Sequence, residues 1–181
     1  RTDSGGAGKR RGGLGYEKHY RVLVDCHTIV TADRVRLGCY GVKGGKAGQP
    51  FCVTADLDGA ARDLGGLVDG EPLKAGQVLR VVTTGGGGWG DPLERETGRV
   101  LRDVLQGKVS AEAARCDYGV VLAARAAGAE QDDYSVEAAA TRKLRDQLRA
   151  QRAAPLPMID RGPGYEKMLR GEFKPRVSNA S

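Results

Sequence analysis

The sequence predicts an α+β protein in which a glycine-rich unit of short strands is followed by helices and then by an extended C-terminal tail. Glycine supplies 28 of the 181 residues, far above the usual share of about 7%, and most of these glycines fall between Gly5 and Gly90. After Asp91 apolar residues recur at helical spacing, and prolines gather from Pro155 onward. We therefore expect a glycine-rich β unit over 1–90, a mainly helical segment over 91–154, and a tail over 155–181 that packs on a partner.

The first 90 residues carry the signals of short strands joined by tight turns. The stretch "YEKHYRVLVD" places Tyr20, Val22 and Val24 on one face, which is a strand signature. A glycine loop over 38–50 and a turn at 74–76 each precede another run rich in β-branched residues. This pattern favours an antiparallel sandwich or a barrel-like unit. The predicted strands lie within 16–25, 27–34, 51–56 and 78–83.

A helix is predicted directly after the glycine run "TTGGGGWGDP". Asp91 is a suitable N-cap, and Pro92 fits the first helical position, where its missing N–H group has no partner to lose. Gly107 marks the end of this helix. The helix has one apolar face, formed by Leu93, Val100, Leu101, Val104 and Leu105.

Two further helices and a short strand are predicted before the tail. Ser110 caps a short helix, and the apolar run over 119–123 indicates a strand. Ser135 is expected to open the longest helix, whose apolar stripe is thin against a charged remainder. Such a helix either lies on a larger partner surface or is an ordinary solvated helix. The tail after Pro155 needs another surface if it is ordered.

Composition argues against several function classes. With 40% hydrophobic and 29% charged residues, the chain has the make-up of a soluble globular protein. No stretch approaches the roughly 18 consecutive apolar residues of a membrane-spanning helix. The net charge is +6, but the densest basic cluster is the three residues Lys9 to Arg11, and aromatic residues make up only 5%. A nucleic-acid surface usually has larger basic patches and aromatic stacking platforms. We therefore expect neither a membrane partner nor a nucleic-acid partner.

The four cysteines are isolated in the sequence and form no CxxC pair. They also lack zinc-ligand spacing to His19 or His27. Isolated cysteines are typical of reduced thiols in the cytoplasm, where they pack as small buried side chains. We therefore predict a cytoplasmic protein with no metal site in this chain. The cysteines are Cys26, Cys39, Cys52 and Cys116.

The run Gly85 to Gly88 is the first candidate for chemistry. Successive glycine N–H groups can form a concavity that binds an anion, and a helix N-terminus beyond them adds partial positive charge. The run is neither a Walker A motif nor a dinucleotide fingerprint, and Asp91 would repel an anion at the helix start. From the residues alone, a structural turn is favoured over phosphate binding, with Trp89 as a packing anchor.

Two other glycine-rich stretches, "DSGGAGKRRGG" and "GGKAG", contain Ser4 and Lys46. Cations beside glycines can meet a phosphate or carboxylate, although solvated charges on turns are the simpler alternative. His27 lies near Asp25, but no nucleophile completes an acid–base arrangement around either histidine. The residues therefore leave the catalytic groups unknown. The candidate substrate- or intermediate-binding residues are Gly85, Gly86, Gly87, Gly88, Asp91, Ser4 and Lys46.

A set of segments in fixed order resembles the C-terminal portion of the hydantoinase B / 5-oxoprolinase family, which includes the large subunits of acetone and acetophenone carboxylases. These segments are "DSGGAGKRRGGLG", "GGKAG", "LKAGQVLRVVTTGGGGWGDPLERE", "VLRDVLQGKVSAEAARCDYGVVL" and "DRGPGYE". The resemblance runs from Asp3 to about Glu166, and GGGGWGDPLER is its most specific block. Since a complete B-type subunit is much longer and this chain begins at Arg1, we expect a fragment, a processed product or a split subunit.

The resemblance implies an ATP-dependent, multi-subunit enzyme. An A-type partner subunit would bind ATP and Mg and phosphorylate the substrate's carbonyl oxygen, after which a cyclic amide of the hydantoin or oxoproline type is hydrolysed. The alternatives are carboxylation of a ketone and a non-catalytic structural module of the same complex. A divalent metal would be held by the N-terminal part of the B-type subunit, which is the second expected partner. The isolated chain is expected to be inactive.

Overall fold

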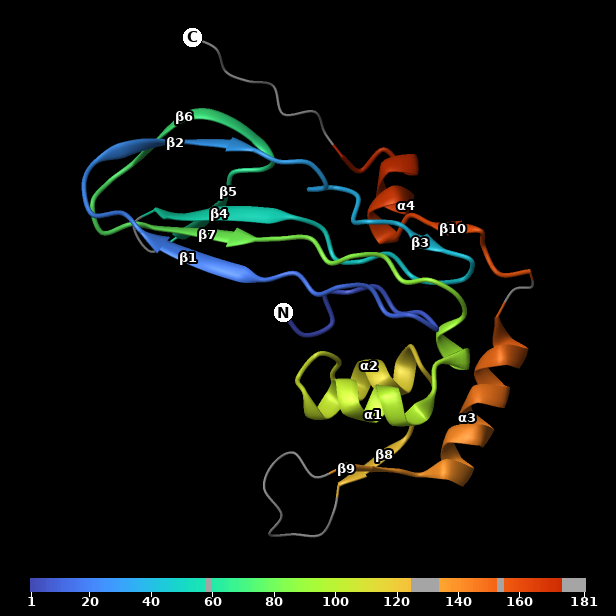
Figure 1. Ribbon diagram of the computed structural model, residues 1–181. Coiled ribbons are helices and arrows are strands. Elements are labelled where there is room, and N and C mark those ends of the chain that lie inside the picture. Colours follow the sequence, from blue (N-terminus) through green and yellow to red (C-terminus); the bar gives the residue numbers. More distant parts are fainter. Residues whose placement is uncertain (58–59, 125–133, 153–154, 174–181) are drawn as a thin grey trace.

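The computed structural model describes residues 1–57, 60–124, 134–152 and 155–173, and it contains both strands and helices, as the sequence predicted (Figure 1). Strands dominate the first half and helices the second, with the C-terminal helix lying back against the first half (Figure 1). The first-half strands are β1 (Glu17–Arg21), β2 (Cys26–Thr31), β3 (Gly41–Val42), β4 (Cys52–Leu57), β5 (Ala60–Asp63), β6 (Leu67–Leu73) and β7 (Val78–Val82). The later elements are η1 (Pro92–Glu94), α1 (Thr97–Leu105), α2 (Ala111–Cys116), β8 (Leu122–Ala124), β9 (Tyr134–Val136), α3 (Ala138–Gln151), β10 (Ile159–Asp160) and α4 (Pro163–Leu169).

Two antiparallel sheets form a small sandwich at one end of the molecule. One sheet has four strands in the order β1-β7-β4-β5, and the other pairs β2 with β6 (Figure 1). The sheets bury apolar side chains between them because alternate residues of each strand point inward. This core contains Val30, Val53, Ala55, Leu64 and Leu73. The expected antiparallel sandwich is therefore present, and β5 and β6 are strands that the sequence pattern did not indicate.

Three glycine-rich segments, residues 4–15, 38–48 and 84–90, continue from the sandwich and pack backbone against backbone. A Cβ atom on Gly85 would lie 1.7 Å from the carbonyl oxygen of Ser4, and one on Gly87 would lie 1.8 Å from that of Tyr40. A Cβ on Gly6 would lie 1.9 Å from the carbonyl oxygen of Lys46. Real Cβ atoms do not approach so closely, so each segment touches the other two only because glycine has no side chain. We call this unit the glycine layers.

The expectation that these glycines mainly serve tight turns needs correction. Of the glycines in the glycine layers, only Gly44 and Gly90 have a positive φ, at 88° and 72°. The others keep ordinary backbone angles and are required by close approach instead. A cluster of glycines fits tight turns with positive φ and close backbone packing equally well. The sequence pattern therefore could not separate these two reasons for the glycines.

The helical half has its own small core, and two predicted helix starts are shifted: the helix expected from Pro92 is divided into η1 and α1, and α3 begins later than expected. Ala7 from the glycine layers packs there with Val100 of α1 and Ala114 of α2. The predicted N-cap Ser110 is confirmed, because its hydroxyl accepts from the N–H group of Ala113 at 3.0 Å. Ser135, however, does not open α3: it lies in β9 opposite β8, and α3 begins at Ala138. Strand pairing over 134–136 takes precedence over the capping tendency of serine.

The C-terminal segment lies on the glycine layers and is partly helical. Strand β10 pairs with β3, and the N–H groups of Lys43 and Gly44 donate to the carbonyl oxygens of Met158 and Pro157 at 2.8 and 2.9 Å. The predicted extended tail therefore also contains α4, which starts with Pro163. Within the described ranges, none of the helices is both long and apolar enough to cross a membrane.

All four cysteines are free thiols, but they do not all pack as small buried side chains. Cys26 and Cys116 are exposed, whereas Cys39 and Cys52 are half-buried. Cys26 begins β2 and Cys116 ends α2, and both positions face solvent. The predicted burial is therefore wrong for these two residues, because isolated spacing carries no information on which face of an element a cysteine occupies.

Candidate functional site

The glycine run 85–88 forms the inner segment of the glycine layers. The N–H groups of Gly85, Gly86 and Gly88 donate to the carbonyl oxygens of Gln49, Gly13 and Lys46, at 3.1, 2.9 and 2.9 Å. Each N–H group has a single proton, so these three amides are already used by the protein and form no anion cradle. The geometry therefore favours the structural alternative for these glycines over phosphate binding through their backbone.

Ser4 is fully buried at the start of the first glycine-rich segment. Its hydroxyl donates to the carbonyl oxygen of Arg1 at 2.6 Å and accepts from the N–H group of Gly15 at 2.9 Å. The bond from Gly15 joins the two ends of this segment, and the bond to Arg1 closes a turn just before it. Ser4 therefore holds the glycine layers together and offers no exposed surface to a ligand.

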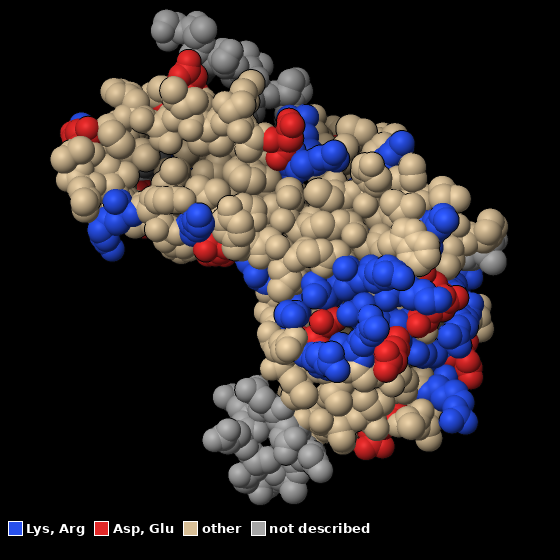
Figure 2. Space-filling model, in the orientation of Figure 1, with Lys and Arg blue, Asp and Glu red and all other residues tan. Residues whose placement is uncertain are grey.

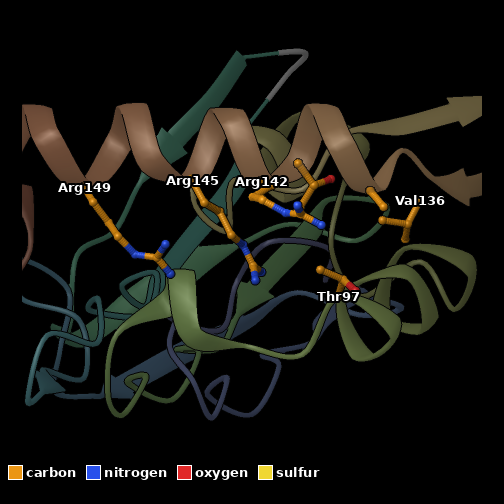
Figure 3. A pocket seen from close by; sticks show the side chains of 7 residues that line it. Thr97, Val136, Arg142, Arg145 and Arg149 are labelled. Atoms are coloured by element: carbon orange, nitrogen blue, oxygen red, sulfur yellow. The ribbon is translucent and has the colours of Figure 1, made fainter.

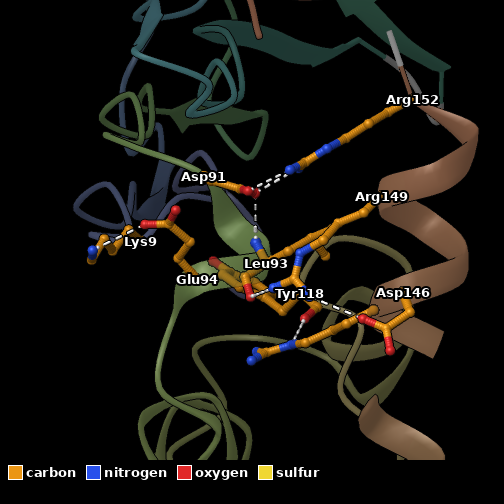
Figure 4. A network of polar contacts seen from close by, with 9 residues as sticks. Lys9, Asp91, Leu93, Glu94, Tyr118, Asp146, Arg149 and Arg152 are labelled. Atoms are coloured by element: carbon orange, nitrogen blue, oxygen red, sulfur yellow. Dashed lines mark hydrogen bonds and ion pairs between the residues drawn. The ribbon is translucent and has the colours of Figure 1, made fainter. Parts of the chain in front are cut away.

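Asp91 ends the glycine run and is the centre of a buried polar contact (Figure 4). Its Oδ1 accepts from the N–H group of Leu93 at 2.9 Å, which confirms the predicted N-cap, although the capped element is the short turn η1. Arg152, at the end of α3, donates from Nη1 to Oδ1 at 2.7 Å and from Nη2 to Oδ2 at 2.6 Å. This bidentate pair ties the end of α3 to the glycine run.

The electrostatic state of Asp91 follows from these contacts. Burial raises the pKa of the carboxyl group, but the hydrogen bonds from Arg152 and from the Leu93 N–H group together outweigh that effect. The net result is a pKa below the ordinary value of 3.8. Asp91 is therefore ionised near neutral pH, and its charge is neutralised by Arg152.

A cavity of about 320 Å³ lies beside this contact, between the glycine layers, η1, the ends of α2 and α3, and the chain leading to β10. Lys46 stands at its wall and its Nζ pairs with Oδ1 of Asp117 at 2.5 Å. Asp160 accepts from the N–H groups of Ala47 at 2.8 Å and Gly162 at 2.9 Å. The cavity is lined by Gly44, Gly45, Lys46, Pro92, Leu93, Cys116, Asp117, Leu148, Arg152, Leu156, Pro157 and Asp160. We call it the Lys46 cavity.

The Lys46 cavity combines an apolar wall with a few polar groups, the usual make-up of a small-molecule site. Leu148, Leu156 and Pro157 supply apolar surface, while the exposed Lys46 can exchange Asp117 for another anion. Within the described residues, no three His, Cys, Asp or Glu side chains gather as a metal site. The arrangement can thus bind a small, partly apolar molecule that carries a negative or polar group.

The structure brings some of the predicted residues together and separates others. Lys46 lines the cavity, and Asp91 contacts it through Arg152, whereas Ser4 lies inside the glycine layers. Sequence reasoning missed Arg152 and Asp117, which complete the two ion pairs. The pairs span 61 and 71 residues of sequence, so no local pattern could have indicated them.

Comparison with known proteins assigns the family. The model of the family described as "Hydantoinase B/oxoprolinase" matches residues 1–92, which include all of the glycine layers and the run that ends at Asp91. The match covers more than half of the chain, and the chain belongs to this family. The resemblance carried by the ordered glycine-rich segments is confirmed.

Several relatives show the same similarity over more of the chain. An uncharacterised protein of Methanocaldococcus jannaschii is 39% identical over 145 residues, 80% of this chain and 25% of that protein. The caprolactamase subunit beta of Pseudomonas jessenii is 36% identical over 129 residues, 67% of this chain and 22% of the subunit. The acetone carboxylase alpha subunit of Xanthobacter autotrophicus is 30% identical over 189 aligned positions, 85% of this chain and 24% of the subunit.

A solved structure shows the same fold. The crystal structure of the ATP-dependent caprolactamase from Pseudomonas jessenii superposes with a TM-score of 0.63 at 32% identity, over 80% of this chain and 24% of that one. The chain therefore spans about a quarter of the length of the relatives that it matches, with shares of 25%, 22% and 24%.

Proposed function

We propose that this chain is the C-terminal piece of a hydantoinase B-type subunit in an ATP-dependent enzyme complex that opens a cyclic amide. Membership of the family, together with 36% identity to a caprolactamase subunit beta, carries the proposal. Caprolactam is a cyclic amide, as hydantoins and oxoproline are. The amide carbonyl is a poor electrophile, and transfer of a phosphoryl group to its oxygen makes the ring carbon open to attack by water.

The cofactors and partners follow from the same assignment. We infer that ATP and Mg bind to an A-type partner subunit and that a divalent metal is held by the N-terminal part of the B-type subunit. Exposed apolar side chains on the sandwich support contact with further protein: Leu67 is 83% exposed, Leu23 82% and Ile29 70%. The chain would then be inactive alone and active only in the complex, in the cytoplasm.

Within this complex, the predicted binding residues would have different roles. Lys46 would meet the negative charge of the activated intermediate at the Lys46 cavity, because it is the exposed cation on the cavity wall. Gly85 to Gly88 and Ser4 would shape the wall from inside the glycine layers. Asp91 would hold η1 and the end of α3 together beside the cavity, through its bonds to the Leu93 N–H group and to Arg152.

Two alternatives have their own support. Carboxylation of a ketone is favoured by 30% identity to the acetone carboxylase alpha subunit over 85% of this chain. A purely structural module is favoured because the amides of Gly85, Gly86 and Gly88, as well as Asp91, are paired within the protein. Both alternatives keep the chain in the same multi-subunit family, so the substrate and the effect of cavity variants must separate them.

The test is substrate-dependent ATP hydrolysis by the complex that contains this chain. We expect ADP release with caprolactam, a hydantoin or 5-oxoproline in the absence of bicarbonate. ATP turnover only with a ketone and bicarbonate would favour the carboxylase, and no turnover with any of these substrates would refute the proposed function.

A matched pair of variants tests the role of this chain in that activity. We expect Lys46→Gln to raise KM for the cyclic amide or to lower kcat by about 10-fold or more, the effect of removing one charge-assisted contact. Lys9→Gln removes an exposed lysine of the same glycine layers, paired with Glu94 at 2.9 Å, and should leave turnover unchanged. Equal, wild-type turnover in both variants would support the structural module instead.

A further inference from the structure

A second cavity, of about 300 Å³, lies along α3 between Ala138 and Arg149, where the helix passes the start of α1 (Figure 3). Arg142, Arg145 and Arg149 point from α3 toward this cavity, and Thr97 of α1 faces them (Figure 3). Apolar surface comes from Val136 and Ala138. The cavity is lined by Thr97, Val136, Ala138, Thr141, Arg142, Arg145 and Arg149, and we call it the arginine cavity.

The positive charge of the arginine cavity is not balanced by its own walls. None of its lining residues is acidic. Arg145 uses Nε and Nη2 to donate to the carbonyl oxygens of Tyr118 and Arg95, at 3.0 and 2.7 Å, which satisfies hydrogen bonds but leaves the charge uncompensated. In the part of the chain that the structure describes, Arg142 makes no ion pair or side-chain hydrogen bond.

Two of the acidic residues beside the cavity are already paired, whereas Glu137, the N-cap of α3, makes no side-chain cap hydrogen bond. Asp146 pairs with Arg149 at 3.2 Å, so the third arginine is partly neutralised. Glu96 precedes α1 and pairs with Arg99 at 3.2 Å. Burial lowers the pKa of the Arg145 guanidinium, and the nearby charge of Arg149 lowers it further. The charge of Asp91 opposes both effects but does not reverse the net shift.

The start of α1 adds hydrogen-bond donors on the opposite side. Thr97 is the first residue of this nine-residue helix, and Glu96 at the N-cap makes no side-chain cap hydrogen bond. The first N–H groups of a helix have no partner within the helix, and they carry partial positive charge. Lysine and arginine side chains also gather on the half of the molecule that carries the helices, as the space-filling view shows (Figure 2). The field at the cavity therefore favours a negative ligand.

We propose that the arginine cavity binds the phosphate group of a small phosphate monoester. Two guanidinium groups, Arg142 and Arg145, lack a carboxylate, and a phosphate monoester near pH 7 carries a charge of about −1.5 to −2, which balances them. Arginine presents its donors in a planar fork that fits phosphate oxygens. The volume and the apolar walls leave room for an organic portion beside Val136 and Ala138. This site is separate from the Lys46 cavity and does not depend on the proposed function.

Calorimetric titration of the intact protein that carries this chain tests the proposal. Phenyl phosphate combines a phosphate monoester with an apolar body, inorganic phosphate tests the anion alone, and benzoate tests a single negative charge on the same body. At about 0.15 M salt, where nonspecific attraction is screened, we expect one phenyl phosphate per chain, bound more tightly than inorganic phosphate and benzoate.

Arginine variants and a matched control decide where the ligand binds. Arg142→Gln should weaken binding of phenyl phosphate by about 10-fold or more, because one charge-assisted contact is lost. Arg142 is exposed, so this variant leaves the fold intact, and Arg145→Gln provides a second test at the half-buried arginine. Lys143→Gln removes the same charge from the exposed side of α3, outside the cavity lining, and should leave binding unchanged.

Three results would overturn the proposal. They are the absence of phenyl phosphate binding at millimolar concentration, equal weakening by Lys143→Gln and Arg142→Gln, and benzoate binding as tight as that of phenyl phosphate. Each result is independent of turnover, so failure of the cyclic-amide assay would leave the proposal standing.

Discussion

Gly85 illustrates at the level of a single residue how the glycine layers hold together. Its amide donates to Gln49, and the space where a side chain would begin is filled by the carbonyl oxygen of Ser4. A methyl group there would have to displace the backbone of Ser4 and Gly5. Backbone in a packed layer cannot avoid the contact by changing a rotamer, as a side chain could. Close backbone contact therefore explains the residue type without any ligand.

Replacement of Gly85 by alanine is expected to destabilise the protein by about 1–3 kcal/mol or more, because the added Cβ would lie 1.7 Å from the Ser4 carbonyl oxygen. Gly13→Ala is the matched control, since a Cβ on Gly13 has nothing within 4 Å and its φ is not positive. It should leave stability unchanged or raise it by up to about 1 kcal/mol. Chemical denaturation measures both, and equal stability of the two variants would contradict the packing account.

The free energy of unfolding should depend on pH through the carboxyl group of Asp91. Its carboxyl pKa lies below 3.8 in the folded protein, so folding favours the ionised form. The contribution of the ion pair is therefore fully present above pH of about 5, and it is lost as pH falls through the folded-state pKa. We expect Asp91→Asn to lower stability near pH 7 by about 1–3 kcal/mol and to flatten the loss of stability on acidification.

The control for this prediction is Asp146→Asn. Asp146 pairs with Arg149 on the exposed side of α3, where its side chain is 66% exposed, so this ion pair should contribute little. Denaturation midpoints measured from pH 7 to pH 3 compare the variants. A pH profile for Asp91→Asn that follows the wild type would show that the Arg152 pair does not contribute to acid sensitivity.

At the scale of elements, α3 is attached mainly by arginine side chains. Its apolar stripe is thin: Thr141 is its only buried residue, and Leu144 and Leu148 are half-buried. Arg145 donates to the carbonyl oxygens of Tyr118 and Arg95, and Arg152 binds Asp91 (Figure 4). Polar contacts from the middle and from the C-terminal end of α3 therefore take the place of a larger apolar face.

Removal of one of these attachments should loosen α3 alone. We expect Arg152→Gln to speed amide hydrogen exchange in α3 by about 5- to 30-fold, which corresponds to a loss of about one or two kcal/mol in local stability, while β4 and β7 stay protected. Lys143→Gln should change neither. Faster exchange in the sheets as well would mean that Arg152 supports the whole fold rather than α3.

The elements show which sequence signals carry structural information. Asp91 and Ser110 were identified as caps because a cap depends on contacts two or three residues away. The start of α3 was misplaced at Ser135, because pairing between β8 and β9 is a tertiary event. Strand β6 was missed since only Val68, Glu71 and Leu73 of its residues are shielded from solvent, so its sequence lacks a clear alternation.

The candidate site was predictable only in part for a similar reason. Lys46 and Asp91 stand in short glycine-rich motifs, which the sequence displays directly. Their partners Asp117 and Arg152 come from other elements, and the cavity exists only where the chain leading to β10 returns to the glycine layers. Glycine spacing also could not separate an anion loop from close packing, because both require the absence of a side chain.

For the whole molecule, the glycine layers are the centre to which the other parts attach. The sandwich continues from one end, the helices pack against Ala7, and the C-terminal segment pairs with β3. The aligned part of this chain represents only about a quarter of each relative, at 25% and 22% of their lengths. We therefore propose that the activity belongs to the complete complex, in which this chain would shape one wall of the site.

The stoichiometry of ATP use and ring opening in that complex tests the central claim most directly. We predict that ADP and ring-opened product form in equal amounts from a cyclic amide, and that removal of bicarbonate changes neither. Ring opening without ATP, or ATP use that requires bicarbonate and yields a carboxylated ketone, would contradict the assignment as an ATP-dependent cyclic amidohydrolase.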